Sequence, residues 1–201
     1  MKKITLAAAV AATLLGFAAP AQAVLVAAVP ALSCDAGGVM VTGFAPDALD
    51  CSGAWAGNDT PQQAELLAQL AIDFAPTLGA GAIFTVIGKS DDANNGPFTS
   101  NPEVTAGTLT FDSVQTGFFA ITLKSATSFS TYLFDGGVAG LSSIDFSMAG
   151  VSLNANGGVQ DLSHATFIDI TTAVPEPETY ALMLAGLGAV GFMAKRRRKV
   201  A

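Results

Sequence analysis

The single histidine of the chain, His164, is the residue best suited to proton transfer near neutral pH. Ser163 precedes it, and Asp145, Asp161 or Asp169 could orient its imidazole, so the residue types of a hydrolytic triad are present. No G-x-S-x-G nucleophile turn occurs in the sequence, however. We therefore expect no catalytic set, with His164 an ordinary hydrogen-bonding side chain at the entrance to the last strand.

An acidic run, Asp91-Asp92-Ala93-Asn94-Asn95-Gly96, has some of the residue types of a calcium loop. It departs from that loop at Ala93, which supplies no ligand oxygen, and it has no glutamate at the twelfth position. We expect a tight polar turn and no metal site, with loose calcium binding as the alternative.

Two cysteines, Cys34 and Cys51, are the only ones in the chain. A metal site would need further Cys or His residues nearby, and His164 is far along the chain. In an exported protein an isolated pair at this spacing indicates a disulfide. Closing this loop would stabilise the fold by about 3 kcal/mol on the chain-entropy model.

The single tryptophan, Trp55, falls in a segment rich in Gly and Asp, where we expect a loop. An exposed Trp there could stack on a sugar ring, whereas the thirteen phenylalanines are expected to fill the core. Asn58-Asp59-Thr60 fits a glycosylation sequon, but Thr60 is better explained as a helix cap.

One amphipathic helix is predicted directly after this segment. Thr60 suits the cap, Pro61 the first helical position, and Gln63 completes a capping box. The apolar residues that follow recur at helical spacing, and Pro76 ends the run. They are Leu66, Leu67, Leu70, Ala71 and Phe74.

The rest of the body has the composition of short strands separated by Gly, Asn, Asp and Ser. This pattern predicts a mainly β fold, an antiparallel β-sandwich or jelly-roll-like body carrying the one helix. The expected strands are 39–42, 82–89, 108–112, 118–124, 128–134, 144–148 and 165–171.

The N-terminus has the three parts of a secretion signal. Lys2 and Lys3 are followed by an apolar run over residues 4–19, and Ala21 and Ala23 form a small-x-small cleavage site. We expect signal peptidase to cut after Ala23, so that residues 1–23 are the signal peptide. A retained anchor is the alternative.

The C-terminus has an uncharged apolar stretch, 180–194, followed at once by basic residues. Its fifteen residues would span about 22 Å as a helix, short of the roughly 30 Å hydrocarbon core. Bilayer thinning and snorkelling side chains would have to cover the difference. The positive-inside rule keeps the basic stop cytoplasmic, which places the body outside the inner membrane. That stop is Lys195, Arg196, Arg197, Arg198 and Lys199.

Residues 174–201 together resemble the PEP-CTERM sorting signal of Gram-negative bacteria. The resemblance rests on the run Val174-Pro175-Glu176-Pro177-Glu178-Thr179-Tyr180, the apolar stretch and the Arg-rich end. The two prolines favour an extended backbone that a protease can bind. The resemblance implies that an exosortase recognises Pro175, Glu176 and Pro177 and cleaves near them. A plain membrane anchor is the alternative.

The body between these ends, residues 24–173, is expected to be one exported domain and is strongly acidic. Seven of the nine Lys and Arg residues lie in the two ends, which leaves Lys89 and Lys124 in the body. Fourteen of the sixteen Asp and Glu residues remain there. Such a body cannot neutralise phosphates, so we expect no nucleic-acid partner.

These features predict a non-enzymatic cell-surface or matrix protein without a cofactor. Its expected partners are the secretion machinery, signal peptidase, an exosortase, the inner membrane before processing, and extracellular polysaccharide. Two alternatives stay open: a secreted carbohydrate-binding module with Trp55 exposed, and a secreted hydrolase with two carboxylates converging in a cleft.

Overall fold

The computed structural model describes residues 24–28, 34, 47–172 and 183–190. The described residues of the body form eight strands and two helices. In chain order these are β1 (Val26–Ala27), β2 (Asp50–Ala56), α1 (Gln63–Asp73), α2 (Ala75–Leu78), β3 (Ile83–Lys89), β4 (Ala106–Gln115), β5 (Phe118–Lys124), β6 (Ser128–Asp135), β7 (Leu141–Ser147) and β8 (His164–Thr171).

A six-stranded antiparallel sheet forms the centre of the fold, in the order β1-β2-β6-β5-β8-β3, and β4 pairs with β7 in a second sheet. The β5–β6 hairpin pairs Phe118 with Asp135 and Lys124 with Phe129. On its other edge β5 pairs with β8, which closes the chain back onto the hairpin. The mainly β, antiparallel architecture predicted from the sequence is confirmed.

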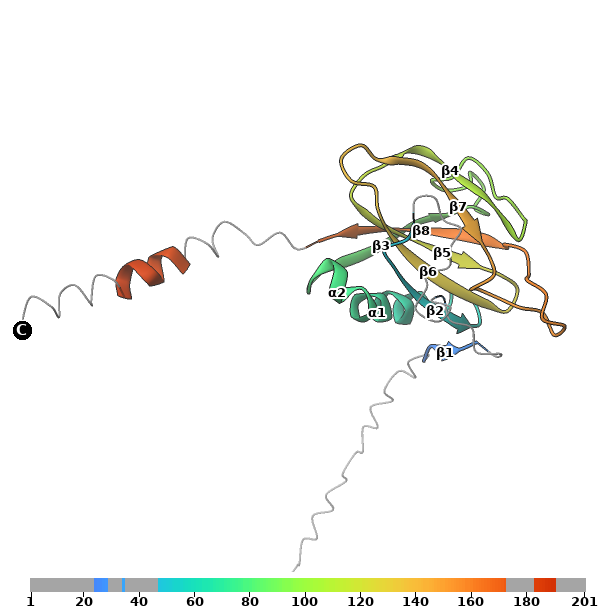
Figure 1. The fold of residues 1–201 in the computed structure, drawn as a ribbon, viewed down its shortest axis with the longest axis horizontal. Helices are drawn as coiled ribbons and strands as arrows, with labels where there is room; N and C mark the ends of the chain where they lie inside the picture. The colour runs from blue at the N-terminus through green and yellow to red at the C-terminus, as the bar shows by residue number, and fades with distance from the viewer. Residues whose placement is uncertain (1–23, 29–33, 35–46, 173–182, 191–201) are drawn as a thin grey trace, which may run out of the picture.

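The central sheet is buried on both faces because successive side chains of a strand point to opposite sides. Phe119, Ile121 and Leu123 of β5 belong to the core shared with β4 and β7, whereas Ala120 belongs to the core shared with α1. Figure 1 shows the two helices on one side of the large sheet and β4 and β7 on the other.

Helix α1 packs through the predicted apolar face, since Leu66, Leu70 and Phe74 are buried against the sheet. Its predicted start is wrong. The N-cap is Gln62 and makes no side-chain cap bond. Thr60 lies in the preceding turn, and its hydroxyl accepts a bond from the Lys89 ammonium instead of capping the helix. α1 ends at Asp73, and Pro76 lies in the first turn of α2.

Strand β2 occupies the segment where the sequence predicted a loop. Its small residues fit because the strand passes close to β6: a Cβ on Gly53 would lie 2.7 Å from Ser130 Oγ. The pairing with β6 shifts register between Ser52 and Trp55, as at a β-bulge. The strand places Cys51 and Trp55 on the central sheet.

Several predicted segments lie outside the described residues, namely the signal peptide 1–23, the strand at 39–42 and most of the tail 174–201. Residues 183–190 form a helix inside the predicted membrane stretch 180–194. Within the described ranges, no helix has the length and apolar character that a membrane crossing requires.

Candidate functional site

Asp59, in the loop between β2 and α1, is a carboxylate with only 3 % of its surface exposed. His164 Nε2 lies 3.0 Å from its Oδ1, while Lys89 Nζ lies 3.3 Å from its Oδ2. Thr166 Oγ1 donates a hydrogen bond of 2.7 Å to Oδ2. Burial alone would raise the pKa of Asp59, but the bonds from His164 and Thr166 and the charge of Lys89 hold it well below its usual range.

His164 is buried at the first position of β8, where the sequence predicted it. Its Nδ1 lies 3.3 Å from Asp91 Oδ2, so both ring nitrogens face a carboxylate. The Lys89 ammonium also lies 3.5 Å from His164 Nε2, so the ring contacts two carboxylates and one cation. The sequence offered Asp145, Asp161 or Asp169 as partners, and the structure uses Asp59 and Asp91 instead.

Lys124 completes this group, which we call the Asp59 cluster (Asp59, Lys89, Lys124 and His164). It pairs with His164 across β5 and β8 and is 4 % exposed. Its ammonium donates to the carbonyl of Ser125. Burial lowers the pKa of Lys124, with repulsion from Lys89 acting in the same direction and attraction to Asp59 opposing it. Both lysines and the histidine of the body thus meet around one carboxylate.

The Asp59 cluster connects the β2–α1 loop, the end of β3 and the start of β8. Ser163 shows no sign of activation by His164, because its side chain is exposed and both ring nitrogens already face carboxylates. The Asp59 cluster therefore holds distant segments together and has none of the nucleophile–base geometry of a triad.

The acidic run after β3 forms the polar turn that the sequence predicted. Asp92 Oδ2 accepts a bond of 2.8 Å from the Lys89 amide, while Asp91 contacts His164. Asn95 adopts a left-handed conformation with φ 55°. Within the described residues, no group of three Cys, His, Asp or Glu side chains is arranged to hold a metal ion.

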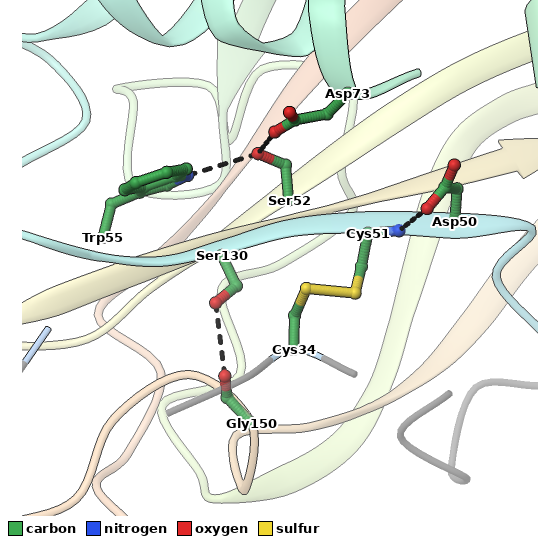
Figure 2. Close-up of a disulfide and its surroundings, with 8 residues drawn as sticks. All are labelled: Cys34, Asp50, Cys51, Ser52, Trp55, Asp73, Ser130 and Gly150. Carbon is green, nitrogen blue, oxygen red and sulfur yellow. Dashed lines mark hydrogen bonds between the residues drawn. A yellow bond between two sulfur atoms is a disulfide. The ribbon is translucent and has the colours of Figure 1, made fainter. Parts of the chain in front are cut away.

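Cys34 and Cys51 form the predicted disulfide, with their Cα atoms 6.0 Å apart. Figure 2 shows the bond attaching Cys34 to β2 next to Asp50. Both cysteines contact the core shared with β4 and β7.

A groove between α1 and the edge of the central sheet carries Trp55. The indole Nε1 donates 3.2 Å to Ser52 Oγ, and that hydroxyl donates 2.6 Å to Asp73 Oδ2, as Figure 2 shows. Gln69 Nε2 donates 2.7 Å to the other oxygen of Asp73. Trp55 lies half-buried on a strand and not in the predicted loop, and it lacks the full exposure that the carbohydrate-binding alternative requires. We call this space the Trp55 groove; it measures about 360 Å³ and is lined by Val24, Leu25, Trp55, Ala64, Glu65, Ala68, Gln69 and Ile72.

A second, more open hollow of about 620 Å³ lies beside the loop that precedes β8. Glu103 and Asp161 both line it, together with polar side chains such as Gln160. Both carboxylate residues are exposed to solvent.

Comparison with protein families finds a match over residues 173–198 to the PEP-CTERM protein-sorting motif. The chain carries a PEP-CTERM sorting motif. The match contains Pro175, Glu176 and Pro177 and the basic residues up to Arg198, all of which lie outside the described residues. A PEP-CTERM motif implies an exported protein that is sorted through the membrane with an exosortase as its processing partner. No curated protein and no solved structure matches the chain.

Proposed function

We propose that this PEP-CTERM protein is a non-enzymatic component of the cell surface or extracellular matrix of a Gram-negative bacterium, associated with exopolysaccharide. The sorting motif carries the proposal, because it begins at residue 173, two positions after β8 ends at Thr171. A folded acidic body is thus joined almost directly to the signal that directs its release.

The proposed route follows from the two ends of the chain. Signal peptidase removes residues 1–23 during export, and the stretch 180–194 holds the body at the outer face of the inner membrane. The exosortase then cuts near Pro175–Pro177 and delivers the body to the surface or the medium. The Asp59 cluster and the disulfide stabilise the body once it has left the cell.

The intact mass of the protein from its host, with and without the exosortase, tests this route. We expect a wild-type species that begins at Val24 and ends near Pro177, and a longer species that retains Ala201 when the exosortase is removed. A wild-type protein that still ends at Ala201 would make it a membrane-anchored domain and would overturn the matrix role.

The Trp55 groove supports a second candidate function, that of a carbohydrate-binding module. Trp55, Glu65 and Gln69 bring a ring, a carboxylate and an amide to one groove, the groups with which proteins bind sugars. Trp55 is the single tryptophan, so its fluorescence reports on this groove alone. Oligosaccharides from the host polysaccharide should shift that emission in the parent and bind less to Gln69→Ala. Emission that no oligosaccharide changes would exclude the groove as a sugar site.

The proposal of a non-enzymatic role is tested at Glu103 and Asp161, the two carboxylate residues of the open hollow. A glycosidase needs one carboxyl kept protonated in a shielded site, and both of these residues are exposed. We expect no release of reducing ends from host polysaccharide. Release that is abolished by Glu103→Gln or Asp161→Asn would instead identify a hydrolase.

A further inference from the structure

Glu65, in the first turn of α1, has a buried carboxylate oxygen without a partner. No hydrogen bond reaches its Oε2 from the described residues, although this atom is shielded from solvent. An unpaired buried oxygen of an ionised carboxylate is unfavourable because it loses its water without gaining a donor. The N-terminus of α1 compensates only in part, through the helix dipole. A hydrogen-bond donor brought to this oxygen would remove the penalty, and a charged donor would do so most strongly.

The chain segment that enters the fold at Val24 lines the same groove as Glu65. Its position is fixed by β1, where Val26 pairs with Ala56 and Ala27 pairs with Trp55. The Ala28 amide donates 2.9 Å to the Ala54 carbonyl, and Leu25 packs against the helix-side core. Val24 therefore lies at the rim of the Trp55 groove, with 76 % of its surface exposed.

The described part of the body brings no other cation to this groove. Lys89, Lys124 and His164 all belong to the Asp59 cluster. Glu65 is the one titratable side chain among the described lining residues. The nearest other acid along α1, Asp73, already accepts bonds from Ser52 and Gln69.

We propose that signal-peptide cleavage after Ala23 creates an ion pair between the new α-ammonium group of Val24 and Glu65. Hydrolysis of the Ala23–Val24 peptide bond adds water: Ala23 leaves as a carboxylate, and the Val24 nitrogen becomes an amine that takes up the proton. In the precursor the same nitrogen is a neutral amide. The ion pair thus belongs to the mature chain alone and stabilises it after export; it rests on the signal cleavage in the proposed function.

A double-mutant cycle tests the ion pair: two forms of the N-terminus are each compared with Glu65 and with Glu65→Gln. One chain, Val24–Ala201 in detergent, is released from a removable fusion so that Val24 comes first, and the other retains Ala21-Gln22-Ala23. We expect the urea midpoint to be higher for the Val24 form, and this difference to vanish in Glu65→Gln. Glu103→Gln, an exposed glutamate outside the Trp55 groove, is the matched control and should preserve the difference. An equal difference in all backgrounds, or none in the parent, would overturn the proposal.

The reactivity of the α-amine gives a second readout that does not depend on unfolding. An ion pair that raises the amine pKa by one unit lowers the fraction of reactive neutral amine about tenfold at neutral pH. Acylation of Val24, followed by mass spectrometry, should therefore be about tenfold slower in the parent than in Glu65→Gln. Equal rates would contradict the pair.

The mass of the host protein separates the two ways in which the inference could fail. A mature chain that begins at another residue would overturn the proposed signal cleavage and this pair with it. A mature chain that begins at Val24, together with no coupling to Glu65, would overturn the pair alone and leave the proposed route intact.

Discussion

Asp59 is the residue on which the buried charges of the body depend. It is 3 % exposed and contacts Lys89, His164 and Thr166. Removing one partner of a buried ion pair is strongly destabilising because the remaining charge loses its compensation. Lys89 and Lys124, the two lysines of this acidic body, both interact with Asp59 and partly compensate its charge.

We expect Asp59→Asn to lower the free energy of unfolding by about 3–5 kcal/mol, because Lys89 would lose its counter-charge and Thr166 and His164 would lose the carboxylate that they contact. Urea unfolding followed by circular dichroism measures this change. Asp112→Asn, at an exposed position on β4, is the matched control and should change stability by less than about 0.5 kcal/mol. Similar effects of the two substitutions would contradict a structural role for the Asp59 cluster.

Asp59 should also make stability depend on pH. Because its pKa is lower in the folded state than in the unfolded chain, it stabilises the fold above about pH 4 and loses this contribution as the pH falls. The urea midpoint should therefore stay constant above about pH 5 and fall progressively as the pH is lowered further. Thr166→Val, which removes one hydrogen bond to the carboxylate, should reduce the size of this drop. An unchanged drop in Thr166→Val would show that other carboxylates produce it.

The sequence identified His164 as the notable residue but could not identify its partners. His164 and Asp59 are separated by 105 positions along the chain, and they meet because β8 lies beside β3 and β5. Contacts at this range are set by strand order, which local patterns do not encode. The same limit applies to Glu65 and Val24, since only the pairing of β1 with β2 brings them to one groove.

Elements with strong periodicity can be predicted from the sequence, whereas β2, which lacks it, cannot. The expected strand 118–124 coincides with β5, and the predicted apolar face of α1 is buried or half-buried except for Ala71, which is exposed. The sequence predicts a loop at β2 because Gly53 and the neighbouring small residues lack the apolar alternation of a strand. It predicts a cap at Thr60 because sequence cannot show that Lys89 binds this hydroxyl.

Gly53 is the residue that allows β2 to lie so close to β6. Its φ of +136° is strained for other residues, and a Cβ would approach the Ser130 Cα to 2.9 Å. We expect Gly53→Ala to lower the free energy of unfolding by roughly 2–4 kcal/mol, from backbone strain and overpacking together. Thermal or urea unfolding of Gly53→Ala and the parent measures this difference in stability.

Gly137→Ala is the control for Gly53→Ala because it separates strain from steric conflict. Gly137 has a φ of +57°, and a Cβ added to it would meet no atom within 4 Å. Its substitution should cost only the left-handed backbone term, about 1–2 kcal/mol. A Gly53→Ala effect no larger than this would show that β2 has room for a side chain.

At the scale of the whole molecule, the chain is a folded body followed by a PEP-CTERM sorting motif. The sorting motif could be predicted from the sequence because such a signal is a linear pattern of residue types, whereas the signal peptide at residues 1–23 stays a prediction. The function of the body cannot be predicted in the same way, because it depends on which side chains the fold brings together. The described body has no triad geometry at His164, and its stabilising features are a buried charge cluster and a disulfide.

The disulfide should stabilise the body after its export. Cys34 and Cys51 are separated by 17 positions, so closing this loop stabilises the fold by about 3 kcal/mol on the chain-entropy model. We expect Cys34→Ser/Cys51→Ser to lose that amount in urea unfolding, and reduction of the parent by dithiothreitol to produce the same midpoint. Since the loss is entropic in the unfolded chain, the native circular dichroism spectrum should stay unchanged. A double mutant that is as stable as the oxidised parent would show that the β1–β2 pairing and the core alone hold this end of the sheet in place.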